Sequence, residues 1–544
     1  MLPPIVRRLL STPLGLALLV LATLSLISIA TLPASYAGKL FGSGSGTTVA
    51  GAAGKHKDCE DDNPNGLCPI DDTVAAPPPD YDLLDAPVPE AYRRYFPDLR
   101  LPKELRHPEL APLADRLVQF LSRPALSHKD ALEANQAGCP ADIIDQLTNP
   151  ALLSDHQAYW IQIDANEIIE RRAELVQYLA KQVEAGHKVL GTMLKGPDKR
   201  GIVLTGGNGD TVLRIEMLLR HLRKIGSKLP VEVVHFSDEL NDKKYRKRLE
   251  KLGAKLVAVQ GVEKTPGAWK NYQIKAMAMI QSSFTELIYL DSDNVPLRTL
   301  DHLFSAPLYE ENGRAAFWPD ISKDHADNAI WRIVGDTCHL REWTFESGQI
   351  VLDKRGNSGN NLAALWLAAG MLEQQDFYFT MCGGDKDTFR WAFRMLDLAY
   401  APAPRWLSAL GILNEFDDNR FCGHTMLQYD LVAQGAAPPP LFVHSNLLKY
   451  LEGGLEQGRV FTHIKHLPLD LYDEASLNSI FFFVYHGNGR GMCTDMLVHG
   501  NAEEKMGDAL YAMQQPLVVG THDFPELEGF EDAWWKAGGR VGGW

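Results

Sequence analysis

The chain has 544 residues, 45% of them hydrophobic and 23% charged, and a formal net charge of −15. This composition is that of an ordinary globular protein with a substantial core, and it excludes a chain that is disordered throughout. The acidic balance argues against a nucleic-acid-binding protein, which would present a basic face.

An uncharged apolar segment near the N-terminus predicts membrane insertion. It covers residues 14–32 and follows Arg7 and Arg8. At 1.5 Å per residue, a helix of that length spans roughly 28 Å, close to the hydrocarbon thickness of a bilayer. Because the arginines precede it, residues 1–13 are expected in the cytosol and the rest of the chain in the lumen. A cleaved signal peptide ending at residues 35–37 is the alternative, although signal peptides usually have a shorter apolar region.

The next segments differ in composition and so predict different structures. Residues 33–80 are rich in glycine, serine, alanine, aspartate and proline, which predicts a flexible stem. Residues 81–199 place apolar side chains at helical spacing and predict a helical region. Residues 200–544 form the last predicted domain.

Seven cysteines are present, and none of them forms a C-x-x-C pair, so a common zinc-site spacing is absent. A luminal location permits disulfides. Cys59 and Cys68 could close a small loop, but spacing alone does not give the pairing. The odd number leaves at least one thiol without an intramolecular partner.

From Gly201 onward, short apolar runs alternate with helical patterns. The predicted strands cover residues 201–205, 231–236, 255–259 and 286–290, and the predicted helices residues 211–225, 242–253 and 272–283. This alternation predicts an α/β domain whose mostly parallel sheet carries helices on both faces. Ligands of such sheets bind beyond the carboxyl ends of the strands.

Two polar motifs follow predicted strands at such ends. Gly206 and Gly207 begin the sequence GGNGD and would let the backbone approach a ligand closely, with a plain tight turn as the alternative. Asp291 and Asp293 follow the strand ending at residue 290. Two carboxylates so close repel each other, so we expect a divalent cation such as Mg²⁺ or Mn²⁺ between them and a phosphate. Neutralising either aspartate should then leave stability unchanged or raise it.

Four sequences in a fixed order give the chain a specific resemblance: GIVLTGGNGD, LIYLDSDNVPLRTLDHLF, ESGQIVLDK and GGDKDTFRWAF. With the sequence KLPVE, they resemble the family-71 glycosyltransferases, the fungal Golgi α-1,2- and α-1,3-mannosyltransferases that build mannan side branches. The similar part covers residues 201–449, about half of the chain.

The resemblance implies a GT-A nucleotide-sugar-binding fold and a retaining transfer of mannose from GDP-mannose to a mannose-containing glycan. It implies Mn²⁺ as the metal and a role in protein glycosylation. It also implies a single-pass type II Golgi membrane protein with a luminal catalytic domain, with a glycosyltransferase complex as a further expected partner.

The resemblance also assigns residues to the donor site. Asp291 and Asp293 match the metal-binding DxD motif, and His444 would complete the metal shell, with a core or solvated histidine as the alternative. Lys449 would contact the diphosphate. Lys275 would reach the nucleotide, with a surface lysine as the alternative. An imidazole ligand favours Mn²⁺ over Mg²⁺.

Three further carboxylates are expected at the sugar. Glu346, placed just before a strand, and Asp385 and Asp387, at a glycine-rich turn, match family motifs that line the sugar pocket. Carboxylates there would stabilise the positive charge that develops on the transferring sugar. Asp387 could instead cap the helix that follows it. Trp318 and Trp331 offer faces for sugar stacking, but a buried core position is favoured.

Two other functions stay open. The same fold could use a UDP-sugar, as a galactosyl- or N-acetylglucosaminyltransferase, because the fold does not fix the donor. The chain could also be an inactive scaffold of a glycosylation complex, although the intact acidic motifs argue against lost catalysis.

Overall fold

The computed structural model describes residues 87–140, 147–266, 270–339, 342–432, 438–467, 480–498 and 516–542. All of them belong to the second of two compact units, residues 60–544. The predicted cytosolic tail, membrane anchor and stem lie outside the described residues. Among the helices that are described, none is long and apolar enough to cross a membrane.

The first described segment, up to residue 199, consists of helices and connecting turns. Its α-helices are α3 (Ala111–Ser122), α4 (His128–Asn135), α6 (Pro150–Gln162) and α7 (Ala165–Glu184), and its 3₁₀ turns cover Glu90–Tyr92, Lys103–Arg106, Pro108–Leu110 and Gly191–Met193. The N-cap Asp164 accepts a hydrogen bond from the Glu167 N–H and so fixes where α7 begins. One face of α7 is buried, as its spacing predicts.

A seven-stranded sheet follows, in the order β3-β2-β1-β4-β7-β6-β8. Its strands are β1 (Arg200–Thr205), β2 (Val231–His235), β3 (Ala254–Ala258), β4 (Glu286–Leu290), β6 (Ala315–Pro319), β7 (Phe345–Asp353) and β8 (Ala401–Pro402). Only β7 runs antiparallel to its neighbours, β4 and β6. The predicted α/β class with a mostly parallel sheet is therefore confirmed. The expectation that Glu346 precedes its strand is wrong, because Glu346 pairs with Trp318 inside the sheet.

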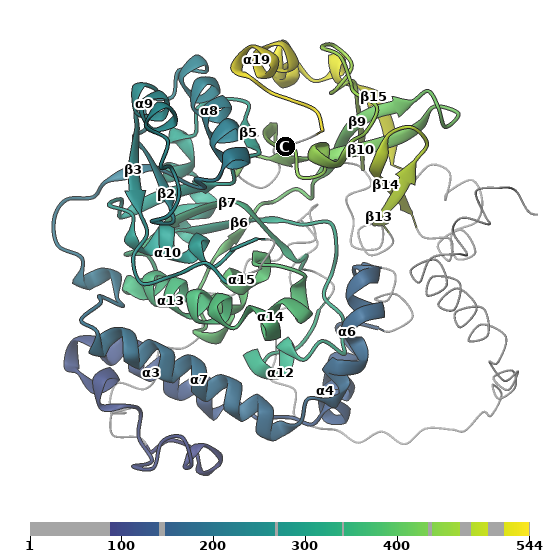
Figure 1. The fold of residues 1–544 in the computed structure, drawn as a ribbon. Coiled ribbons are helices and arrows are strands. Elements are labelled where there is room, and N and C mark those ends of the chain that lie inside the picture. Colours follow the sequence, from purple (N-terminus) through teal and green to yellow (C-terminus); the bar gives the residue numbers. More distant parts are fainter. Residues whose placement is uncertain are drawn as a thin grey trace, which may run out of the picture. The chain divides into compact units, whose positions relative to one another are not determined.

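Helices cover both faces of this sheet (Figure 1). The helices of this part of the chain are α8 (Gly209–Lys224), α9 (Lys243–Lys251), α10 (Ile274–Gln281), α11 (Pro307–Glu311), α12 (Ile330–Val334), α13 (Asn360–Glu373), α14 (Gln375–Cys382) and α15 (Lys386–Met395), with 3₁₀ turns at Asp301–Ser305 and Asn357–Gly359. Alternate residues of β4 enter different cores: Leu287 and Tyr289 pack with α10 and α13, and Ile288 and Leu290 pack with α8. Burial on both faces explains the unbroken apolar run of this strand.

A second sheet, which we did not predict, is antiparallel throughout. Its strands are β5 (Asn294–Pro296), β9 (Ser408–Asn414), β10 (Arg420–Tyr429), β11 (Pro440–His444), β12 (His463–His466), β13 (Ile480–Gly487), β14 (Gly491–Val498) and β15 (Leu517–Gly520). The 3₁₀ turns Leu448–Tyr450, Thr521–Asp523 and Pro525–Leu527 and the helix α19 (Phe530–Ala537) complete this part. β11 lies between β10 and β5, and β5 begins directly after Asp293.

The described cysteines form two disulfides, Cys139–Cys338 and Cys422–Cys493, and leave Cys382 free and buried. The two N-terminal cysteines lie outside the described residues.

Trp318 and Trp331 are 0% and 2% exposed, so both belong to the core, as favoured from the sequence.

Candidate active site

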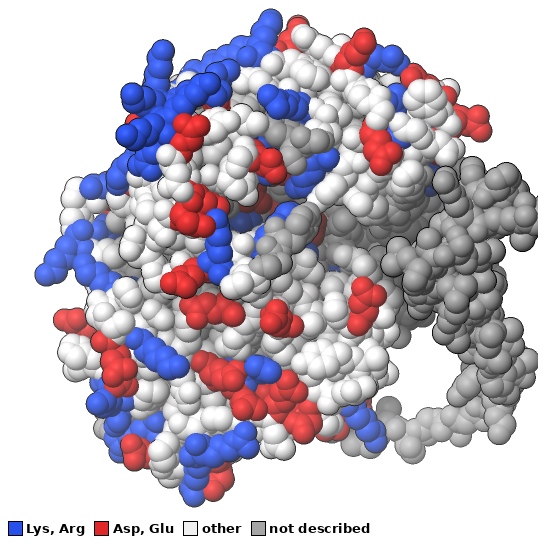
Figure 2. Space-filling view, in the orientation of Figure 1, with Lys and Arg blue, Asp and Glu red and all other residues white. Residues whose placement is uncertain are grey.

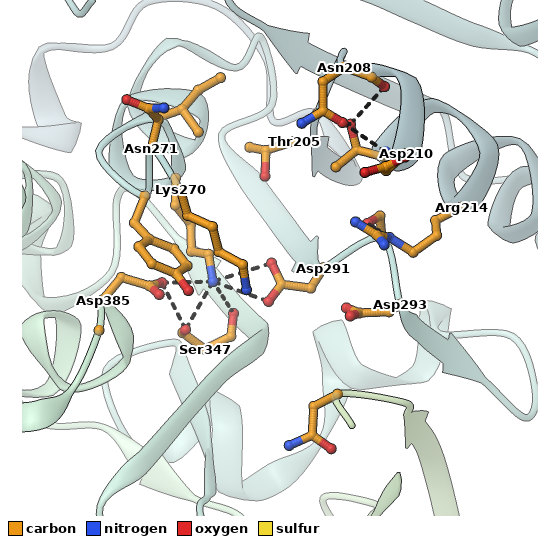
Figure 3. Close-up of a pocket in the computed structure, with 18 of the residues that line it drawn as sticks. Thr205, Asn208, Asp210, Arg214, Lys270, Asn271, Asp291, Asp293, Ser347 and Asp385 are labelled. Atoms are coloured by element: carbon orange, nitrogen blue, oxygen red, sulfur yellow. Dashed lines mark hydrogen bonds and ion pairs between the residues drawn. The ribbon is translucent and has the colours of Figure 1, made fainter. Parts of the chain in front are cut away.

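A cavity of about 810 Å³ lies beyond the carboxyl ends of β1 and β4. Figure 2 shows the molecule hollowed on this face, with acidic and basic side chains around the hollow, and Figure 3 shows the side chains that line the cavity. Of the predicted site residues, the lining includes Gly206, Lys275, Asp291, Asp293, Glu346, Asp385, His444 and Lys449. Gly207 and Asp387 are not part of it.

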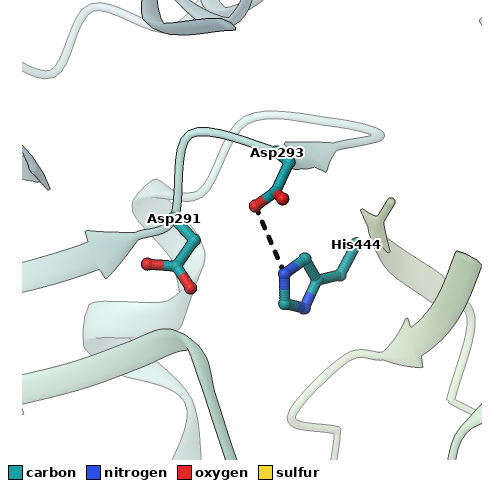
Figure 4. A group of neighbouring side chains, drawn as sticks. All are labelled: Asp291, Asp293 and His444. Carbon is teal, nitrogen blue, oxygen red and sulfur yellow. Dashed lines mark ion pairs between the residues drawn. The ribbon is translucent and has the colours of Figure 1, made fainter. Parts of the chain in front are cut away.

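Two carboxylates and one imidazole meet at one side of the cavity (Figure 4). One ligand atom each from Asp291, Asp293 and His444 lies within 4.8 Å of the others. The pairing of β5 with β11 sets this arrangement, since His444 is opposite Asn294, the residue after Asp293. The His444 Nε2 is 3.4 Å from the Asp293 Oδ1. Two carboxylate oxygens and an imidazole nitrogen form a donor set that suits Mn²⁺.

Gly348 in β7 makes room for this imidazole. A Cβ atom at residue 348 would lie 2.5 Å from the His444 Cε1, so a side chain there would displace the ring. The Gly348 carbonyl also accepts hydrogen bonds from the Asp291 N–H and from the Asn294 side-chain amide. The glycine of the sequence ESGQIVL therefore helps to position two of the three candidate ligands.

His444 lies between the carboxylates of Asp293 and Glu346, with its Nδ1 3.5 Å from the Glu346 Oε1. Burial opposes its charged form, but Glu346 and Asp293 raise the pKa of His444 to about 9. Burial also raises the pKa of Glu346 to about 7. For Asp293 burial acts in the same direction, but Lys449 and His444 hold the pKa of that carboxyl well below its usual value. The pair of aspartates thus faces a positive neighbourhood.

Lys275 connects the metal-ligand candidates to the sugar-site candidates. Its ammonium is 3.2 Å from the Asp291 Oδ1 and 2.7 Å from the Asp385 Oδ2, and it donates to the Ser347 hydroxyl at 2.9 Å. Figure 3 labels these three partners. The residue is 4% exposed, so the surface-lysine alternative is wrong. Burial would lower the pKa of Lys275, but Asp291 and Asp385 raise it well above its usual value. Lys275 therefore stays charged and holds the two carboxylates in place.

Asp387 points away from the cavity. Its carboxylate accepts a hydrogen bond from the Phe345 N–H at 2.9 Å and forms ion pairs with Lys386 at 2.6 Å and Arg390 at 2.9 Å. Asp387 is fully buried and does not line the cavity. It lies in the first turn of α15, and the N-cap residue of that helix is Asp385. The structure gives it a positioning role behind Lys386, a cavity residue.

Gly207 also acts from behind the cavity wall. A Cβ atom at this residue would lie 2.7 Å from the Glu239 Oε2, so the glycine lets the Glu239 side chain fold against the β1–α8 turn. Asn208 caps α8 by accepting from the Thr211 N–H. The sequence GGNGD thus ends β1, starts α8 and leaves Gly206 in the cavity wall.

Several cavity residues were not predicted from the sequence. The basic ones are Arg214, Lys264, Lys270 and Lys386, and others are Phe236, Glu239, Tyr272 and Ser292. The Arg214 guanidinium donates to the Ser292 hydroxyl at 3.2 Å, within the acidic motif. Its place one turn into the helix after GGNGD is a signal that could have identified it. Six cationic side chains in one cavity suit an anionic ligand such as a diphosphate.

Comparison with known proteins supports the resemblance to mannosyltransferases. Residues 199–342 and 336–430 match the mannosyltransferase family model. This part of the chain is similar to that family. The matched part contains every predicted site residue except His444 and Lys449, which lie beyond its end.

Two fungal alpha-1,2-mannosyltransferases are similar to this chain. The alpha-1,2-mannosyltransferase MNN2 of Saccharomyces cerevisiae is 24% identical over 407 residues, 64% of this chain and 64% of that protein. The alpha-1,2-mannosyltransferase MNN22 of Candida albicans is 36% identical over 286 residues, 43% of this chain and 47% of that protein. The chain thus spans about half to two thirds of the length of these relatives. A crystal structure of the galactosyltransferase LgtC matches 37% of this chain and 73% of the LgtC chain, with 10% sequence identity. The TM-score of 0.27 is too low to establish a common fold.

Proposed function

We propose that this chain is a metal-dependent, retaining α-mannosyltransferase that transfers mannose from GDP-mannose to a mannose-containing glycan in protein glycosylation. The observation that carries the proposal is the meeting of Asp291, Asp293 and His444 in a cation-lined cavity of a chain similar to the mannosyltransferase family. We further propose an α-1,2 linkage, because the named relatives are alpha-1,2-mannosyltransferases. A GT-A fold is part of the same proposal.

Asp291, Asp293 and His444 fit a divalent ion and would hold Mn²⁺. Bound there, Mn²⁺ would stabilise the negative charge that develops on the diphosphate leaving group. The His444 Nδ1 has no hydrogen-bond partner among the described residues, whereas the Nε2 faces the Asp293 carboxylate at 3.4 Å.

Two groups among the remaining cavity residues would have separate roles. Arg214, Lys270 and Lys449 are cations on the acidic-motif side of the cavity and would bind the diphosphate oxygens. Glu346 and Asp385 are acidic and would face the sugar, where a carboxylate stabilises positive charge at the anomeric carbon. This charge stabilisation, together with orientation of the acceptor hydroxyl, is what the chain itself supplies.

The test is a transfer assay with full-length protein, Mn²⁺, radiolabelled GDP-mannose and α-mannobiose, followed by linkage analysis. We expect an α-1,2-linked product that disappears with EDTA and in Asp293→Asn. The same assay is carried out with UDP-galactose and UDP-N-acetylglucosamine. Sugar transfer from either of these, and not from GDP-mannose, would contradict the proposed donor. If neither transfer nor donor hydrolysis occurs with any of the three sugars, the chain is a scaffold.

We also propose that residues 14–32 anchor the protein in the Golgi membrane with its C-terminus in the lumen. The full-length protein should then stay in the membrane pellet after carbonate washing, and its C-terminus should be protected from added protease. A mature N-terminus near Gly38 would show a cleaved signal peptide instead.

A further inference from the structure

The proposed chemistry does not use a carboxylate that follows β2 and an ammonium that follows β3. The Glu239 Oε1 is 3.0 Å from the Lys264 Nζ, and both residues line the cavity. Phe236 lines it beside them, with the Lys264 Nζ 5.4 Å from the centre of its ring. An aromatic face next to a hydrogen-bonding pair is a combination that suits a nucleobase.

The sheet order places this group at a suitable distance from the candidate metal ligands. Glu239 follows β2 and Asp291 follows β4, and β1 is the one strand between them. Two strand spacings amount to about 10 Å. An extended nucleotide separates its base from its β-phosphate by a similar distance, so a diphosphate at Asp291 and Asp293 puts the base near Glu239.

Glu239 has unused hydrogen-bonding capacity beside the cavity. Its side chain is only 9% exposed. Among the described residues, the carboxylate accepts from the Phe236 N–H at 3.2 Å and from Lys264. A carboxylate offers about four acceptor positions, so about two remain. Gly207 leaves room for this carboxylate beside the turn that lines the cavity, because a Cβ atom at residue 207 would lie 2.7 Å from the Glu239 Oε2.

We propose that Glu239, together with Lys264, selects guanine in the donor nucleotide. Guanine presents the O6 acceptor beside the N1–H and 2-amino donors, which match an ammonium beside a carboxylate with two free acceptor positions. Uracil presents the O2 acceptor where guanine has its amino group, so the same carboxylate repels it. This inference rests on the proposed use of GDP-mannose and adds the residues that distinguish GDP from UDP.

The test compares GDP, inosine diphosphate (IDP) and UDP by titration calorimetry of the full-length protein with saturating Mn²⁺. IDP lacks only the 2-amino group, so it measures the second hydrogen bond to the carboxylate. For the wild type we expect IDP to bind about ten-fold more weakly than GDP, and UDP more weakly still. In Glu239→Gln we expect GDP affinity to fall by about ten-fold or more and the GDP-to-IDP ratio to approach one.

Asp238→Asn is the matched control. Asp238 also pairs with Lys264, at 3.0 Å, but its side chain is 65% exposed and does not line the cavity. We expect its GDP-to-IDP ratio to equal that of the wild type. Lys264→Met is the second variant should Glu239→Gln not fold, and it should weaken GDP and IDP by the same factor, because both carry O6.

The outcomes separate this inference from the proposed function. An equal loss of GDP, IDP and UDP affinity in Glu239→Gln would place the carboxylate at the ribose and overturn base selection. Wild-type GDP binding with an unchanged ratio in Glu239→Gln would also overturn it but leave the mannosyltransferase proposal standing. Tighter binding of UDP than of GDP by the wild type would overturn both.

Discussion

The fold gives the Asp293 carboxylate cationic neighbours that the sequence motif alone does not reveal. In the sequence, Asp291 and Asp293 are two like charges that repel each other. In the structure, the Lys449 Nζ is 3.1 Å from the Asp293 Oδ2, and His444 lies on its other side. Asp293→Asn should therefore lower the free energy of unfolding of the EDTA-treated protein at pH 7, by about 2 kcal/mol, and the sequence expectation of unchanged or raised stability should fail.

The pH dependence of this effect has a defined sign. The folded-state pKa of Asp293 is lower than its unfolded value of about 3.9. Its stabilisation is therefore present above pH 3.9 and is lost as the pH falls through the folded value. Urea unfolding of wild type and Asp293→Asn at pH 7 and pH 3 measures this, and the gap between the two proteins should narrow at pH 3. A variant more stable than wild type at pH 7 would contradict the argument.

His444 predicts a proton released by metal binding. Its pKa of about 9 means that the metal-free protein carries an imidazolium at pH 7, whereas a metal ligand must be neutral. Mn²⁺ binding should release about one proton, and its affinity should rise about ten-fold per pH unit from pH 7 towards 9. Titration of Mn²⁺ in two buffers of different ionisation enthalpy measures the proton, and His444→Gln should remove the release. Equal heats in the two buffers for the wild type would refute this.

Substitutions of Asp293 and Asp385 should have different effects on nucleotide affinity and transfer rate. Asp293→Asn removes a candidate metal ligand, so GDP–Mn²⁺ affinity and transfer should both collapse. Asp385→Asn leaves Lys275 its partner Asp291, so GDP–Mn²⁺ affinity should change less than about two-fold, while the transfer rate falls about 10²-fold. Calorimetry and a transfer assay on the same variants test this. Equal losses of GDP affinity would move Asp385 into the nucleotide site.

At the scale of elements, the sequence predicts site residues that directly follow a recognisable strand. It does not predict contacts that depend on the pairing of strands far apart in the chain. Asp291 and Asp293 could be predicted because they directly follow an apolar strand. The contact of His444 with Asp293 needs the β5–β11 ladder, which joins segments about 150 residues apart and belongs to a sheet with no strong sequence pattern. Glu239 was missed for a similar reason, since its place in the cavity depends on β2 lying beside β1.

Asp387 holds α15 in place and does not take part in the proposed reaction. Asp387→Asn weakens the ion pairs to Lys386 and Arg390, all of them within a buried network, and should cost about 3 kcal/mol of unfolding free energy. Asp376→Asn is the matched control, because Asp376 is the second residue of α14, as Asp387 is of α15, but is exposed. It should cost less than about 1 kcal/mol. Equal losses in urea unfolding would assign the effect to the helix dipole.

At the scale of the whole molecule, Cys139–Cys338 joins the N-terminal helices to the sheet domain. It closes a loop of 199 residues in sequence separation, against 71 for Cys422–Cys493. Both crosslinks fit the oxidising lumen in which the catalytic domain is proposed to work. They restrict the unfolded chain, and the longer loop restricts it more.

The double variant Cys139→Ala/Cys338→Ala should lose about 2–5 kcal/mol of unfolding free energy. Cys422→Ala/Cys493→Ala should lose about 1 kcal/mol less, because loop-closure entropy grows with the logarithm of loop length. Cys382→Ala is the control, since this buried thiol closes no loop and its loss removes only packing. Urea unfolding of the three oxidised proteins at pH 7 gives the order. If Cys382→Ala were as damaging as Cys139→Ala/Cys338→Ala, packing rather than the crosslink would account for the loss, and the N-terminal helices would be held to the sheet without it.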